Sequence, residues 1–205
     1  MTKYIKQYDD IFTQEELQKI LDLRYESSFR DGRLHDLLVW RNSEDPKWQE
    51  VLKLIESKIT SYKNEYLSSF LNLAPTQLFE ISHIGFLTDK DGSFTETHYD
   101  MEAVFFQNKP ILKPLIMLLY LNEGYEGGQL LFPLEGYLTT PKAGSIVFFP
   151  AGFAFPHVAM PTVVGNKHVC RVTFKIDIEK LKVDVLEIWL LNIQIHCKII
   201  IVVFY

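Results

Sequence analysis

The chain has 205 residues, 47% hydrophobic and 23% charged, an ordinary composition for a globular protein. Its formal net charge of −5 disfavours a nucleic-acid-binding surface, which needs clustered Lys and Arg. Only two cysteines occur, Cys170 and Cys197, so no disulfide framework is implied. The N-terminal MTKYIKQYDDIF lacks the apolar stretch of a signal peptide. Together these features predict a cytoplasmic protein.

Two amphipathic helices are predicted in the first third of the chain. Residues 13–28 start with Thr13 and Glu16, which have the spacing of a capping box. A second helix over 46–69 follows Asp45, a suitable N-cap, and has a proline at its first position. Apolar residues recur every three or four positions in both segments, so each helix is expected to bury one face.

Short apolar runs dominate the chain from residue 76 to 178, separated by Gly, Pro, Asp and Asn. The runs are QLFEISHIGF, THYDMEAVFF, LIMLLYLN, QLLFPL, SIVFFP and HVCRVTFKID. Runs of this length between turn residues predict the strands of a β-sandwich or barrel. We therefore expect one mostly β (α+β) domain over 1–178, with a helical support in 1–75 and a β core in 76–178.

The last segment, 179–205, is apolar and has no assigned role. Its longest uninterrupted apolar run, 199–205, has only seven residues. Polar and charged residues interrupt the rest, so a membrane span is not expected. The segment is interpreted as an added strand or helix, or as a sequence artefact, and it would promote aggregation if exposed.

Candidate metal ligands stand in ETHYDMEAV, residues 96–104. If this segment is a strand, His98 and Asp100 share one face and Tyr99 points away. On the surface such a pair needs no ligand, whereas in a barrel it is costly to bury unless something binds it. His157 supplies a second imidazole 59 residues after His98 (157 − 98). Two imidazoles and one carboxylate are typical of a non-haem Fe(II) site.

The sequence also contains a candidate cationic residue for binding an anionic ligand. Lys167 lies ten residues after His157 (167 − 157), where an ammonium group would neutralise the distal carboxylate of a metal-bound keto acid. Arg171 competes for this role because, four residues further along a strand, it shares the face of Lys167. A solvated surface lysine is the alternative interpretation.

The ordered motifs THYD, LIMLLYLNEGYEGGQLLFP, PKAGSIVFFP and HVAMPTVVGNK resemble the prolyl 4-hydroxylase-like branch of the 2-oxoglutarate- and Fe(II)-dependent dioxygenases, over about residues 76–178. The resemblance implies a double-stranded β-helix, or jelly roll, with the N-terminal helices packed on one sheet. It also implies that His98, Asp100 and His157 are the catalytic iron ligands, and that Lys167 binds the 2-oxoglutarate carboxylate.

The implied reaction is hydroxylation of a peptidyl proline, or of a related amino-acid or small-molecule substrate, with decarboxylation of 2-oxoglutarate to succinate. O₂ is the second implied co-substrate, and ascorbate is a further candidate cofactor. Asp100 favours hydroxylation, because relatives that halogenate have a small residue there. We expect a peptide or small-molecule partner, and we expect binding neither to nucleic acid nor to a membrane.

Three alternatives stay open: a metal-binding or sensing module without turnover, an oxygenase acting on nucleic acid, and a jelly-roll enzyme that uses another divalent metal. The sequence also departs from the family pattern. The strand before His98 reads FEISHIGF and lacks the tyrosine that helps many relatives hold 2-oxoglutarate. His83 is a candidate replacement, or else an ordinary core or surface histidine. Gly127 and Gly128 resemble the family's tight hairpin, and residues 179–205 match nothing in the family.

Overall fold

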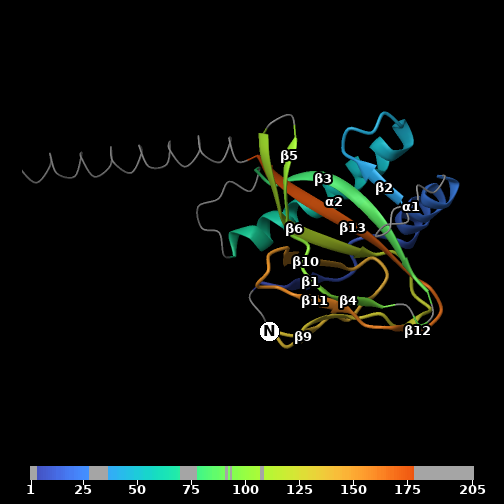
Figure 1. Ribbon diagram of the computed structural model, residues 1–205. Helices are drawn as coiled ribbons and strands as arrows, with labels where there is room; N and C mark the ends of the chain where they lie inside the picture. Colours follow the sequence, from blue (N-terminus) through green and yellow to red (C-terminus); the bar gives the residue numbers. More distant parts are fainter. Residues whose placement is uncertain are drawn as a thin grey trace, which may run out of the picture.

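A computed structural model describes residues 4–27, 37–69, 78–90, 92, 94–106 and 109–177. The expected C-terminal extension, 179–205, lies outside the described residues, as does Cys197. The described part contains two helices and thirteen strands. Figure 1 shows them as a layer of helices followed by two layers of strands.

Both predicted helices are present, as α1 (Gln14–Glu26) and α2 (Pro46–Ser68). The capping box of α1 is complete: Thr13 Oγ1 accepts the Glu16 N–H at 3.3 Å, and Glu16 Oε2 accepts the Thr13 N–H at 2.9 Å. At the start of α2, the Asp45 carboxylate accepts the backbone N–H two residues on at 2.9 Å. Within the described ranges, neither helix combines the length and apolar character that crossing a membrane requires.

The larger sheet is antiparallel and has seven strands. Six follow one another in the order β1 (Lys6–Tyr8), β10 (Ile146–Pro150), β6 (Lys109–Tyr120), β13 (Lys167–Asp177), β3 (Glu80–Asp89) and β2 (Leu37–Trp40), and the seventh, β5 (Glu102–Phe106), pairs with β6. The central strands β6 and β13 are the longest, so they form a frame on which the shorter strands can be placed.

A smaller antiparallel sheet faces the large one. Its order is β4 (Thr95–His98), β11 (His157–Ala159), β8 (Leu130–Phe132) and β9 (Tyr137–Leu138). A separate two-stranded ladder joins β7 (Glu126–Gly127) to β12 (Thr162–Val164).

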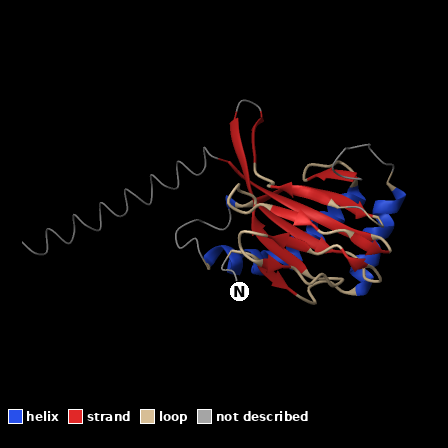
Figure 2. Ribbon diagram, turned by 60° about the horizontal axis from the view of Figure 1, so that its bottom comes forward, coloured by secondary structure: helices blue, strands red, loops and turns tan. Residues whose placement is uncertain are grey.

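Two hydrophobic clusters hold these layers together. One joins the helices to the outer face of the large sheet and includes Ile55 of α2 and Val172 of β13. The other fills the space between the sheets and includes Val169 of β13, Phe149 of β10 and Phe132 of β8. In Figure 2 the helices lie along one side of the strands, as expected for helices supporting one sheet. The odd-numbered residues at the start of β13 therefore face the space between the sheets.

Three sequence predictions need correction. The segment expected to contribute only helices also contributes β1 and β2, which extend opposite edges of the large sheet. The run THYDMEAVFF is not one strand, since β4 ends at His98 and β5 starts at Glu102. Gly127 and Gly128 do not form a tight hairpin, because β7 pairs with β12 and β8 pairs with β11 and β9. Gly127 is needed there because an added Cβ would collide with the Pro161 carbonyl oxygen.

Candidate active site

The smaller sheet brings the three predicted metal ligands together. Strand β4 pairs with β11 so that His98 lies opposite His157, with ring centroids 4.4 Å apart. Asp100 follows the end of β4, where its backbone N–H donates to the Ala151 carbonyl at 3.1 Å. One donor atom from each of the three side chains lies within 4.8 Å of the other two. These donors are close enough to bind one ion.

Both imidazoles present the same nitrogen to Asp100. Nδ1 of His98 lies 2.8 Å from the Glu96 carbonyl oxygen, and Nδ1 of His157 lies 3.1 Å from that of Phe155. A carbonyl only accepts, so in the neutral rings Nδ1 carries the hydrogen and Nε2 keeps its lone pair. The Nε2 atoms of His98 and His157 lie 3.8 Å and 3.4 Å from the carboxylate oxygens of Asp100. Two lone pairs and a carboxylate thus converge.

One side of this cluster is packed and the other is open. The side chain of His157 is 3% exposed, and its ring centroid lies 4.9 Å from that of Phe149 and 5.3 Å from that of Phe132. The side chain of His98 is 39% exposed and that of Asp100 is 13% exposed. Tyr99 points away from the cluster and is exposed, as the sequence predicts. A small molecule can therefore approach from the side of His98.

Arg171 binds Asp100. Its Nη2 lies 3.0 Å from Oδ1 of Asp100 across the space between the sheets. Burial alone would raise the pKa of the Asp100 carboxyl, but the hydrogen bond that His157 donates when Nε2 carries a hydrogen, together with the charge of Arg171, outweighs burial and leaves that pKa below its ordinary value. The carboxylate is therefore ionised and held in one orientation. Arg171 lies four residues further into β13 than Lys167 and contacts the candidate metal ligand Asp100 there.

Lys167 lies at the start of β13 and is buried, with its side chain 5% exposed. Its Nζ donates to the Gly128 carbonyl at 2.9 Å and forms an ion pair with Asp89. The Thr162 hydroxyl is buried and has no hydrogen-bond partner among the described residues. A Cβ added to Gly128 would lie 2.9 Å from Cδ of Lys167 and 3.1 Å from Oγ1 of Thr162. The absence of a side chain at Gly128 thus lets Lys167 and Thr162 pack closely against the backbone and beside each other.

Two tyrosine hydroxyls lie near the same end of β13. Tyr120 donates to or accepts from the Thr139 hydroxyl at 3.2 Å, and the buried Tyr125 hydroxyl meets no hydrogen-bond partner in the ranges that the structure describes. Burial raises the pKa of Tyr120 to about 12, and the negative charge of Asp89 adds to the rise for both tyrosines. Both hydroxyls therefore lie within electrostatic reach of Asp89.

His83 does not take the place of the missing tyrosine. It lies six residues before Asp89 on β3, a separation of about 20 Å along the strand. Its buried ring packs on Trp40, with centroids 4.9 Å apart. Sequence analysis also missed the polar partners of Lys167. Alternation in LIMLLYLN places Tyr120 on the same face as Leu118, but no pattern in the sequence identifies Asp89 as its neighbour.

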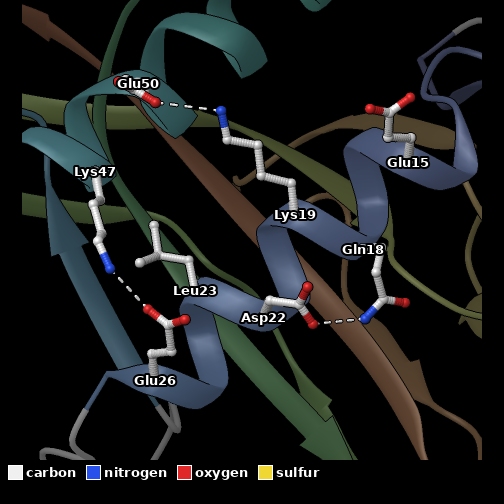
Figure 3. A pocket seen from close by; sticks show the side chains of 8 residues that line it. All are labelled: Glu15, Gln18, Lys19, Asp22, Leu23, Glu26, Lys47 and Glu50. Atoms are coloured by element: carbon white, nitrogen blue, oxygen red, sulfur yellow. Dashed lines mark hydrogen bonds and ion pairs between the residues drawn. The ribbon is translucent and has the colours of Figure 1, made fainter.

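A surface hollow of about 610 Å³ lies elsewhere, between α1 and α2. Figure 3 shows that its lining is largely charged and that the ion pairs Lys19–Glu50 and Lys47–Glu26 cross it. None of the candidate ligands or cations lines it. The hollow is therefore separate from the candidate active site.

Comparison with models of known protein families gives no match, and comparison with curated protein sequences gives none. Several solved structures match. A viral collagen prolyl hydroxylase from Paramecium bursaria Chlorella virus-1, in complex with 2-oxoglutarate, aligns with a TM-score of 0.64 at 18% identity, covering 84% of this chain and 96% of that one. A prolyl-4-hydroxylase from Pseudomonas putida gives a TM-score of 0.56 at 18% identity, covering 83% and 91%.

A prolyl hydroxylase from Trichoplax adhaerens, in complex with a peptide of the hypoxia-inducible factor oxygen degradation domain, gives a TM-score of 0.63 at 17% identity. This match covers 87% of the present chain and 86% of that one. The predicted jelly roll with supporting helices is thus confirmed as the fold, and it is shared with 2-oxoglutarate–Fe(II) oxygenases.

We expect metal binding to require each of the three convergent side chains. His98→Ala, Asp100→Ala and His157→Ala should each weaken Co²⁺ or Fe²⁺ binding by at least about 100-fold, because loss of an outer-shell partner alone costs 10- to 100-fold. Anaerobic titration calorimetry measures this. Glu96→Ala, which removes an exposed carboxylate from the same strand, is the matched control and should bind normally. Equal affinity in all four variants would rule out the site.

Proposed function

We propose that the chain is an Fe(II)- and 2-oxoglutarate-dependent dioxygenase of the prolyl 4-hydroxylase type. The convergence of His98, Asp100 and His157 between the sheets is the observation that carries the proposal. Two imidazoles and one carboxylate are ligands that suit Fe(II), whereas metals that prefer thiolates would be bound less well by this set. The donor set leaves other positions on the ion for a co-substrate, which a closed structural zinc site would not.

The surroundings of Lys167 fit a 2-oxoglutarate carboxylate. A buried ammonium gives such a group a charge-assisted hydrogen bond, and the unpartnered hydroxyl of Thr162 offers a second donor. Gly128 lets both groups pack against the backbone, where a Cβ would collide with Lys167. Lys167 is the better candidate for this role than Arg171, because Arg171 contacts Asp100, which is itself a candidate metal ligand.

Each residue has a separate task in the proposed reaction. His98, Asp100 and His157 would hold Fe(II), with the carbonyls of Glu96 and Phe155 fixing the imidazole tautomers. Bound together with 2-oxoglutarate and O₂, the iron supplies the oxidation, in which 2-oxoglutarate becomes succinate and CO₂ and the substrate gains a hydroxyl group. The protein contributes positioning, charge pairing and a packed wall behind His157.

The substrate we propose is a peptidyl proline or a related amino-acid or small-molecule substrate. The peptide bound to the Trichoplax protein supports a peptide. A screen of proline-rich peptides and free amino acids, followed by mass spectrometry for a gain of one oxygen atom, would identify it.

The test of the reaction is succinate release. Iron-loaded protein with 2-oxoglutarate and O₂ should release succinate even without a prime substrate, and more with one. Asp100→Ala and His157→Ala should lower this release by at least about 100-fold, as loss of an iron ligand requires. If wild-type protein binds iron and 2-oxoglutarate without succinate release, the chain is a binding or sensing module. If the two variants keep wild-type turnover, the iron assignment is wrong.

The two cations of β13 should have different kinetic effects. Lys167→Ala should raise the KM for 2-oxoglutarate roughly 10- to 100-fold, because a hydrogen bond to a charged group contributes about 1.5–3 kcal/mol. Arg171→Ala should act mainly through iron affinity, since Arg171 contacts Asp100. Succinate release measured against 2-oxoglutarate concentration separates them. A rise in KM for Arg171→Ala alone would mean that Arg171 is the carboxylate ligand.

Gly128→Ala should displace the side chains of Lys167 and Thr162, with which the added Cβ collides, and raise the KM for 2-oxoglutarate at least about 10-fold, with iron affinity unchanged. The matched control is Gly136→Ala. Gly136 has a φ of 58° against 68° for Gly128, so both substitutions strain the backbone, but an added Cβ at Gly136 meets nothing within 4 Å. Similar kinetics for the two variants would show that strain, not occupation of the space beside Lys167, is responsible.

A further inference from the structure

The cation assigned to the co-substrate already holds a carboxylate from the chain itself. Asp89 is the last residue of β3 and lies opposite Lys167 in the β3–β13 register. Its carboxylate forms an ion pair with Nζ of Lys167, and the two side chains are 21% and 5% exposed. A carboxylate of this chain therefore stands where the proposed function requires one from 2-oxoglutarate.

Asp89 is an incomplete partner for this pocket. Within the described part of the chain, the Thr162 hydroxyl beside Lys167 stays buried and without a hydrogen-bond partner while Asp89 is in place. A buried hydroxyl without a partner costs free energy. A ligand carboxylate bound to Lys167 has two oxygens, one for the Lys167 ammonium and one for the neighbouring Thr162 hydroxyl. It would satisfy a group that Asp89 leaves unsatisfied.

Two carboxylates and one ammonium do not coexist favourably in this space. Like charges close together in a partly buried site repel each other strongly. Burial raises the pKa of Tyr120 and of Tyr125 and keeps both hydroxyls neutral, so they do not offset the second negative charge. A second carboxylate at Lys167 is thus expected to weaken or break the Asp89 ion pair.

Asp89 is the partner that can leave. It ends its strand and is followed by the exposed Lys90, so rotation of its side chain leads to solvent. Lys167 is more buried and is also held by the Gly128 carbonyl at 2.9 Å. The ammonium therefore keeps its place whichever carboxylate it binds.

We propose that Asp89 is an intramolecular competitor for the carboxylate site of Lys167 and sets the affinity of the protein for 2-oxoglutarate. This inference rests on the proposed function. Asp89 occupies the ammonium in the free protein, and the distal carboxylate of the co-substrate displaces it. A 2-oxo acid without a distal carboxylate, such as pyruvate, does not compete with Asp89 for Lys167. Its affinity for the protein should therefore not change when Asp89 is removed.

The experiment is binding of 2-oxoglutarate to the Co²⁺-loaded full chain, measured by titration calorimetry without turnover. Asp89→Asn should tighten the binding of 2-oxoglutarate about 10-fold, because the competing ion pair no longer has to be broken. A factor of ten in affinity corresponds to about 1.4 kcal/mol. Pyruvate should bind the variant and wild type equally. Glu80→Gln is the matched control, because Glu80 also pairs with a β13 lysine, Lys175, at 3.9 Å. It should leave the affinity for 2-oxoglutarate unchanged.

Unchanged or weaker 2-oxoglutarate binding by Asp89→Asn would overturn the inference, and weaker binding would make Asp89 a residue that positions Lys167. Asp89→Ser serves as a second variant if Asp89→Asn does not give the wild-type circular dichroism spectrum, and the same tightening is expected. If neither wild type nor the variants bind 2-oxoglutarate, the proposed function fails and this inference with it. Binding by wild type without tightening in either variant refutes the inference alone.

Discussion

The site depends on opposite charges that are paired in the space between the two sheets. Arg171 contacts Asp100, and Lys167 contacts Asp89, in each case with side chains that are mostly removed from water. Burying any one of these charges without its partner would cost several kcal/mol, so the pairs constrain how the strands that carry them can be arranged. The same pairing keeps a carboxylate ionised where two imidazoles converge and holds a buried ammonium at the start of β13.

Strand β13 fixes the positions of the two cations, Lys167 and Arg171. Its outward residues, such as Cys170 and Val172, are fixed in the cluster beneath the helices. Its inward residues are then fixed too, and Lys167 and Arg171 lie four positions apart, about 13 Å along the strand. The metal ligands come from the opposite sheet, where the register of β4 and β11 sets His98 against His157. Rigid neighbours on both sides explain why short segments can hold these side chains in place.

Much of this arrangement could be predicted from sequence, because its signals are local. Capping residues and apolar periodicity define α1 and α2, and the order of motifs predicts a jelly roll. The convergence of His98, Asp100 and His157 follows from the family resemblance rather than from spacing, since Asp100 lies past the end of its strand. His98 and Asp100 do lie close together, as predicted. The reason given for it, alternation of side chains along one strand, does not apply, because the strand ends at His98.

Long-range partners were not predictable in the same way. Nothing near Lys167 in the sequence points to Asp89, because the contact depends on the pairing register of two strands 78 positions apart (167 − 89). The same holds for Arg171 and Asp100, and for the buried hydroxyl of Thr162. The short strands β1 and β2 were missed because their stability comes from pairing with the edges of a sheet rather than from a local pattern.

The most direct measurement is a crystal structure of the protein grown anaerobically with Fe²⁺ and 2-oxoglutarate, with anomalous diffraction recorded at the iron edge. The account predicts one strong anomalous peak bonded to Nε2 of His98, Nε2 of His157 and a carboxylate oxygen of Asp100, with 2-oxoglutarate reaching from that peak to Lys167. Iron bound elsewhere, or no iron among these three side chains, would contradict it.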